Sequence, residues 1–109
     1  MERIMQLTML YDFYGDLLTE KQRAVFEMSN FNDMSLSEIA LELGITPQGV
    51  RDFLKRTEKI LTEYESALEL VNKHADRKKV IEEISGMIDV MSVGPNEKSV
   101  IHKKLEKLL

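Results

Sequence analysis

The chain contains no cysteine and no tryptophan, and its 109 residues include five glycines and two prolines. Without cysteine it can form neither a disulfide nor a thiolate metal site, so a cytoplasmic location is expected. So few glycines and prolines permit few turns, which favours long helices and an all-α fold. No apolar run approaches the roughly 20 residues of a membrane-spanning helix, and residues 1–4 lack the basic start of a signal peptide. We therefore expect no membrane association.

The chain also lacks a net positive charge, because its acidic residues outnumber its basic ones and its formal net charge is −4. Proteins that bind nucleic acid tightly and without sequence preference carry basic patches, and their affinity comes largely from phosphate neutralisation. The most informative segment, residues 35–57, is electrically neutral, with as many acidic as basic side chains. The charge balance therefore argues against strong non-specific binding.

Motifs for catalysis are missing as well. There is no glycine-rich phosphate loop, no nucleophile beside a base in the sequence and no cofactor motif. His74 and His102 lie in separate predicted helices without clustered acidic partners, whereas a metal site needs three or four converging ligands. We predict no catalytic, cofactor-binding or metal-binding residue, and a protein that is not an enzyme.

Residues 36–57 carry the clearest pattern in the chain, two short helices joined by a sharp turn. Ser35 and Glu38 have the spacing of a capping box before the first helix, and Gly44 supplies the left-handed residue that ends it. Thr46 can cap the second helix, with Pro47 at its first position. This layout is typical of a helix-turn-helix, whose second helix enters the DNA major groove. The predicted core positions are Ile39, Ala40, Leu43, Ile45, Val50 and Phe53.

Two further helices precede this unit. Residues 2–14 have an apolar face at helical spacing, formed by Ile4, Leu7, Tyr11 and Tyr14. Thr19 and Gln22 form a second capping-box pattern, which predicts a helix over residues 20–30. That helix is expected to bury Ala24, Met28 and either Val25 or Phe26.

The helix that begins at Pro47 is predicted to be unusually long and to end near His74. Its apolar residues recur every 3.5 positions on average, which approaches a coiled-coil seam. We predict a homodimer held through the outer half of this helix; the alternative is that C-terminal helices cover the seam within one chain. The predicted interface residues are Ile60, Leu61, Tyr64, Leu68 and Val71.

The sequence predicts a domain over residues 1–75 and a helical C-terminal extension over residues 76–109. Asp76 is the expected cap of a helix over residues 77–91, and residues 92–96 read as a loop before a last helix over residues 97–109. The residues expected to face inward in the extension are Val80 or Ile81, Ile84, Met87 or Ile88, Met91, Val100 or Ile101, Leu105 and Leu108.

The outward face of the second helix-turn-helix helix carries the predicted DNA contacts. A glutamine at position 48 can pair with adenine and an arginine at position 51 with guanine, each through two hydrogen bonds. Lysines continue this face in steps of four and suit phosphates. The predicted DNA-binding residues are Thr46, Gln48, Arg51, Asp52, Lys55, Arg56 and Lys59. The alternative is a helix-turn-helix that serves only as a packing unit.

Four motifs occur in order and at close spacing: Phe-Tyr at 13–14, Leu-Leu-Thr-Glu-Lys-Gln-Arg at 17–23, Ser-Leu-Ser-Glu-Ile-Ala at 35–40 and Lys-Arg-Thr-Glu-Lys at 55–59. In these motifs residues 1–75 resemble the YlxM-type helix-turn-helix proteins of Gram-positive bacteria. Residues 19–61 are also similar to region four of bacterial sigma factors, which reads promoter DNA. At the recognition helix the family's usual Ser-Arg-Gln-Ala-Val-Tyr-Asp-Asn is Thr-Pro-Gln-Gly-Val-Arg-Asp-Phe here, so Gln48, Val50 and Asp52 carry over.

The resemblance implies an all-helical, sigma-region-four-like protein that binds DNA and is dimeric. It also implies a regulatory link to the signal recognition particle pathway, which for the family is inferred from gene neighbourhood. Two functions are therefore expected to compete. One is a DNA-binding regulator, and the other is an interaction module that contacts the particle's protein or its RNA without binding DNA.

Overall fold

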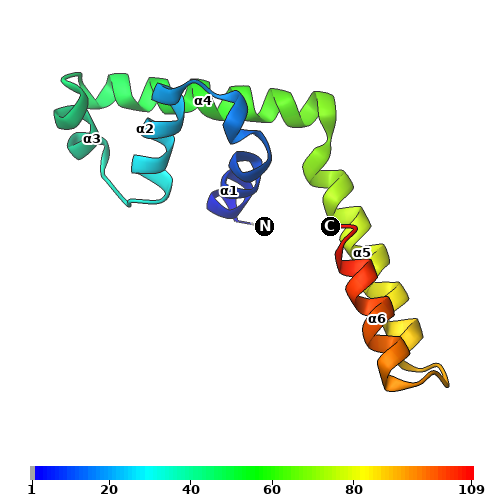
Figure 1. Cartoon of the computed structure of the whole chain (residues 1–109). Helices are drawn as coiled ribbons and strands as arrows, with labels where there is room; N and C mark the ends of the chain where they lie inside the picture. Colours follow the sequence, from blue (N-terminus) through cyan, green and yellow to red (C-terminus); the bar gives the residue numbers. More distant parts are fainter. Residues whose placement is uncertain (1) are drawn as a thin grey trace. The chain divides into compact units, whose positions relative to one another are not determined.

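A computed structural model describes residues 2–109 and divides the chain into two compact units that meet between Glu69 and Leu70. The first unit holds α1 (Arg3–Tyr14), a 3-10 turn (Gly15–Leu17), α2 (Glu20–Asn30), α3 (Leu36–Leu43) and α4 (Pro47–Leu68). The second holds α5 (Leu70–Asp89) and α6 (Pro95–Glu106). The described residues form an all-α fold, as predicted, and no helix among them is both long and apolar enough to cross a membrane (Figure 1).

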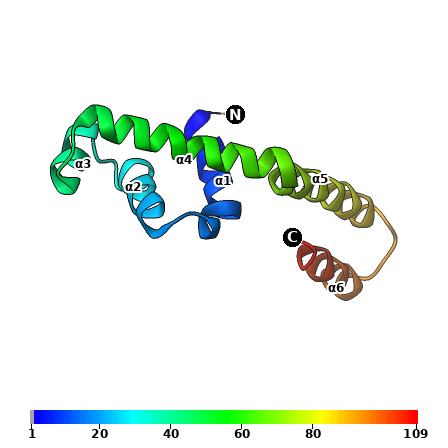
Figure 2. The same ribbon diagram turned by 90° about the horizontal axis from the view of Figure 1, so that it is seen from above.

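In the first unit, α3, α2 and α1 lie in succession along α4, beginning at its N-terminal end (Figures 1 and 2). The part of the core under the helix-turn-helix joins α2, α3 and the first turn of α4 through Val25, Ile39, Ala40 and Val50. Small Ala40 is buried in this cluster, as predicted. Further along α4, Thr57 and Leu61 are also fully buried. The long helix is therefore the element on which the other three are assembled.

The start and stop signals around α2, α3 and the beginning of α4 all form. In both predicted capping boxes the side chain and the backbone exchange hydrogen bonds: Thr19 with Gln22 at 3.1 and 2.9 Å, and Ser35 with Glu38 at 3.1 and 3.0 Å. Because the carboxylate of Glu38 accepts the Ser35 backbone N–H, its pKa lies below the usual value. Gly44 adopts the left-handed conformation with φ of 69°, which ends α3 and turns the chain into α4.

Two glycine-to-alanine substitutions are expected to change stability in opposite directions. Gly44→Ala places a Cβ on a left-handed residue and should lower the unfolding free energy by about 1 kcal/mol. Gly86→Ala lies inside α5, where a Cβ would meet no atom within 4 Å, and should raise it by up to about 1 kcal/mol. Urea unfolding followed by circular dichroism measures both, and equal shifts would contradict the assigned conformations.

Tyrosines attach α1 to its neighbours. The Tyr14 hydroxyl donates to the Glu65 carboxylate of α4 at 2.5 Å, and its ring stacks on Tyr64 with 5.8 Å between centroids. Tyr11 stacks on Phe26 of α2 at 4.7 Å and donates to Glu27 at 2.7 Å. Desolvation, followed by the hydrogen bond to Glu27, raises the pKa of Tyr11 to about 12. These contacts fix α1 against both α2 and α4.

Some residues expected in the core of this unit are exposed. Ile4 is exposed, because the apolar face of α1 is buried only from Leu7 onward. Ala24 is exposed because α2 buries both Val25 and Phe26, so its inner face is centred between them. Ile45 is 43% exposed, because it lies in the turn against Gly49 instead of pointing into the core.

The predicted long helix is two helices. Helix α4 ends at Leu68, since Glu69 adopts a left-handed conformation with φ of 53° and its N–H donates to Glu65 O at 2.8 Å. Helix α5 begins at the next residue, so the predicted end near His74, the predicted start after Asp76 and the predicted domain boundary after residue 75 all fall inside it. Its 22 residues make α4 about 33 Å long. The sequence does not indicate this helix end, because glutamate is not a residue that favours the left-handed conformation that Glu69 adopts.

The five residues predicted as a dimer seam do not form one continuous surface. Leu61 is fully buried within its own chain and Tyr64 stacks on Tyr14, so both contribute to the core of the first unit. Val71 belongs to α5, beyond the break at Glu69. Leu68 is 44% exposed and Ile60 is half-buried. The apolar heptad pattern of α4 is therefore used largely to bind α1, α2 and α3.

The second unit is a hairpin of α5 and α6 joined through residues 90–94 (Figure 1). Ile81 and Ile88 are its buried hydrophobic residues among those described. Asp89 ties the turn to α6, because its carboxylate lies 2.8 Å from His102 Nε2 and its carbonyl accepts from Lys98 Nζ at 3.0 Å. The inner face of α5 runs through Ile81 and Ile88, so the predicted alternatives Val80 and Met87 are exposed. Other residues predicted to face inward are also exposed: Met91, Val100 and Leu108.

Candidate nucleic-acid interface

The helix-turn-helix is positioned by the packing of α3 on α4. Val50 and Ile39 are fully buried between them, and the left-handed Gly44 sets the turn. At 100° per residue, burial of Val50 places positions 48, 51, 52, 55, 56 and 59 on the opposite side of α4. The side chains at these six positions are all exposed. The structure therefore brings six of the seven predicted DNA-binding residues onto one solvent-facing side of a helix.

Thr46 has a different role. Its hydroxyl accepts the Gly49 N–H at 3.0 Å and caps the N-terminus of α4. A capping hydroxyl satisfies one of the orphan amides of the first turn, and its loss typically costs about 1 kcal/mol. Thr46 thus orients the start of the recognition helix.

Gly49 is explained by packing at this same turn. A Cβ at position 49 would lie 3.2 Å from Thr46 Oγ1 and 3.6 Å from Ile45 Cδ1. The distance of 3.2 Å is tighter than an ordinary contact, so a larger residue at position 49 would press on the capping hydroxyl of Thr46. Glycine inside a helix costs about 1 kcal/mol against alanine. At position 49 the absence of a Cβ lets the turn at Ile45 and Thr46 pack closely against α4.

Two polar side chains on the exposed face are already paired. Gln48 Nε2 donates to Asp52 Oδ1 at 3.0 Å, one helical turn away. The carboxylate of Asp52 would repel a phosphate, and the amide of Gln48 offsets part of that effect by donating to it. Gln48 retains its carbonyl oxygen and a second N–H for a base edge. The pair sits at the N-terminal end of α4, where a recognition helix meets bases.

The cationic side chains follow in one stripe. Arg51, Lys55 and Lys59 are four residues apart, and Arg56 lies beside them. Lys59 Nζ is 3.9 Å from Glu63, a loose pair in which both side chains are largely exposed. Such exposed pairs contribute little to stability. This stripe is the strongest positive feature of the helix-turn-helix.

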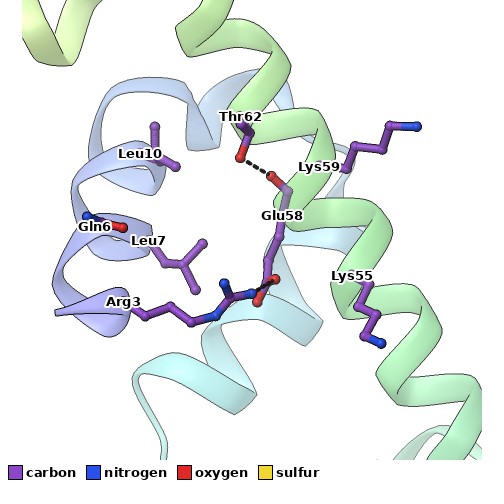
Figure 3. Close-up of a pocket in the computed structure, with 8 residues that line it drawn as sticks. All are labelled: Arg3, Gln6, Leu7, Leu10, Lys55, Glu58, Lys59 and Thr62. Carbon is purple, nitrogen blue, oxygen red and sulfur yellow. Dashed lines mark hydrogen bonds and ion pairs between the residues drawn. The ribbon is translucent and has the colours of Figure 1, made fainter.

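Next to the stripe, α1 and α4 enclose an open pocket of about 380 Å³ (Figure 3). Leu7 and Leu10 line it from α1, and Thr62 lines it from α4. Arg3 reaches across from α1, and its guanidinium donates to Glu58 at 2.5 Å. In Figure 3 the side chains of Lys55 and Lys59 extend from α4 into solvent, pointing away from α1 and from this ion pair. The polar lining residues are Arg3, Gln6, Lys55, Glu58, Lys59 and Thr62.

Arg3 and Gln6 were not expected at this surface. Arg3 is 55 positions away from Glu58 in the sequence, and no local pattern connects them. The signal in the sequence is indirect: positions 55, 58, 59 and 62 share one side of a helix, and a basic residue opens the first helix. Among residues 2–109, the structure groups no three side chains that could together hold a metal ion.

Comparison with known proteins agrees with this architecture. A family model described as "UPF0122: Putative helix-turn-helix protein, YlxM / p13 like" matches residues 1–103. The chain belongs to the UPF0122 family. The YlxM resemblance inferred from residues 1–75 is thereby confirmed, and it extends into α6.

Relatives in the UPF0122 family match most of the chain. A protein of Caldanaerobacter subterraneus subsp. tengcongensis is 55% identical over 82 residues, covering 75% of this chain and 70% of its own. One from Desulforamulus reducens is 37% identical over 113 residues, covering 98% and 97%. One from Bacillus thuringiensis is 35% identical over 108 residues, covering 99% and 98%. All are named UPF0122 proteins, so their names add the family and no activity.

Proposed function

We propose that this UPF0122 protein is a non-enzymatic cytoplasmic regulator that binds duplex DNA through the N-terminal half of α4. The observation that carries the proposal is the exposed face of Gln48, Arg51, Lys55 and Lys59 on the second helix of a helix-turn-helix. The N-terminal residues of such a helix contact base edges in the major groove, while residues further along contact the backbone. The order of side chains along α4 fits that division.

The side chains on the exposed face of α4 favour a moderate affinity for duplex DNA. Arg51 can donate two hydrogen bonds to guanine, and the two lysines can each neutralise a phosphate. Asp52 and Glu58 on the same side of the helix reduce the positive potential, and the chain as a whole has a net charge of −4. We therefore expect selective binding that depends strongly on salt, with weak attachment to arbitrary DNA.

A fluorescence anisotropy titration tests the proposal. Labelled duplexes from the organism's own genome are titrated with the full chain at several salt concentrations. The proposal expects at least one duplex to bind, with log K falling linearly as log salt rises. Absence of binding to every duplex at low salt would overturn it.

The competing function is an interaction module for the signal recognition particle, which rests on the family resemblance. It predicts that the full chain captures the particle's GTPase or its RNA. Recovery of either component, together with no binding to duplex DNA, would favour this function over the DNA-binding regulator. The same capture together with DNA binding would connect regulation to the particle.

The regulator is proposed to act as a homodimer, and the second unit supplies a surface for it. Val80, Ile84 and Met87 are exposed on α5, Met87 by 66%, with the four- and three-residue spacing of a coiled-coil seam. A forty-residue hairpin buries too little apolar surface to be stable unaided, and association is a common remedy. Light scattering should give twice the chain mass, and Ile84→Asp should halve it, whereas Lys79→Asp should not. A monomeric wild-type protein at micromolar concentration would contradict this.

A further inference from the structure

The ion pair between Arg3 and Glu58 lies on the same side of α4 as the proposed DNA-reading residues. From Gln48, successive positions 51, 55, 58 and 62 advance by three or four residues, so they stay on one side of the helix. The pocket between α1 and α4 is lined by three of these positions and by Arg3 and Gln6. DNA that lies along the reading face past Lys55 therefore meets the first turn of α1.

The geometry of Arg3 suits a phosphate. One nitrogen of its guanidinium, Nη2, donates to Glu58 Oε2 at 2.5 Å, while the side chain as a whole is 75% exposed. A guanidinium has five N–H donors in a rigid plane, so an edge facing solvent can bind a phosphate oxygen while another edge holds a carboxylate. Glu58 is mostly buried, at 24% exposure, and therefore provides a fixed anchor.

We propose that Arg3 is a DNA-backbone contact, and that Glu58 is a positioning residue that holds its guanidinium at the edge of the pocket between α1 and α4. The contact extends the DNA interface from the helix-turn-helix to α1 (Figure 3). Charge complementarity and continuity with the α4 face identify the ligand as a phosphodiester of duplex DNA. This inference rests on the proposed function, since it assigns a further contact to the same partner.

A substitution cycle on the full chain tests the inference. Arg3→Gln should weaken duplex binding by about threefold or more and lower the slope of log K against log salt by about 0.9, the value for one lost phosphate contact. Arg77→Gln on α5 removes the same charge from an exposed site of the second unit and should leave affinity and slope unchanged. Arg3→Lys keeps the charge without the planar fork and should fall between wild type and Arg3→Gln.

Repeating the Arg3→Gln substitution in a protein that also carries Glu58→Gln distinguishes two roles for Arg3. Arg3 either contacts a phosphate directly or only neutralises the negative charge of Glu58. If Arg3 binds phosphate, Arg3→Gln still weakens binding and still lowers the salt slope in that background. If Arg3 only neutralises Glu58, the double variant binds as Glu58→Gln does, and the inference is wrong. Wild-type binding with Arg3→Gln equal to Arg77→Gln would overturn the Arg3 contact and leave the proposed function standing. Failure of the wild type to bind any duplex would overturn both.

Discussion

Leu61→Ala is expected to remove about 2–5 kcal/mol of the unfolding free energy of the first unit. Leu61 is fully buried on α4, where α1 and α2 pack, so truncation leaves a cavity that the fixed helices cannot fill. A small domain has about 5–15 kcal/mol in total, so the variant should be marginal or unfolded at 37 °C, roughly physiological temperature. Urea unfolding followed by circular dichroism measures the loss.

Leu68→Ala is the matched control, because it makes the same truncation at the last residue of α4, where the side chain is 44% exposed. It should cost less than about 1 kcal/mol, as surface substitutions do. The two results together separate core from interface on α4. If Leu61→Ala left stability intact and changed only the chain's mass in solution, Leu61 would belong to a dimer seam after all.

Arg51→Ala is expected to have the largest effect on DNA binding. Loss of a bidentate contact to a base costs about 1–3 kcal/mol, which corresponds to roughly fivefold to 150-fold in affinity. The loss should be greatest for the preferred duplex and small for unrelated ones, since a base contact discriminates sequence. Because Arg51 is exposed, stability should be unchanged.

Lys55→Ala, one turn further along α4, provides the comparison. A phosphate contact carries no sequence information, so this variant should weaken binding to all duplexes alike and reduce the salt slope by about 0.9. Anisotropy titrations of both variants against preferred and unrelated duplexes distinguish the two roles. Identical, sequence-independent losses for Arg51→Ala and Lys55→Ala would contradict base reading by Arg51.

The helix-turn-helix could be predicted in detail because its signals are local. Both capping boxes, the left-handed Gly44 and the Thr46 cap lie within four residues of their partners, and all form. The exposed face of α4 followed from the same reasoning, since burial of Val50 fixes the rotation of the helix. Here local chemistry and helical period determine the geometry.

The remaining features depend on contacts that no local pattern encodes. The α4–α5 break occurs at a glutamate in a left-handed conformation, where the sequence continues a helical period without glycine or proline. The apolar heptads of α4 predicted a partner helix for its outer half, and there α1 packs on α4, with the Tyr14 hydroxyl bonded to Glu65 across 51 positions. Arg3 was missed for the same reason. Tertiary packing determines what these residues contact, and those contacts are visible only in the structure.

Above all, we propose that α4 binds duplex DNA through its exposed N-terminal face. Backbone amide chemical shifts of the isotopically labelled full chain, recorded during titration with the preferred duplex, test it most directly. We expect the largest shifts at residues 46–52, continuing through 55–62 to Arg3 and Gln6, with residues 70–109 little affected by direct contact. Shifts confined to residues 70–109, or none at all while the duplex is bound, would contradict it.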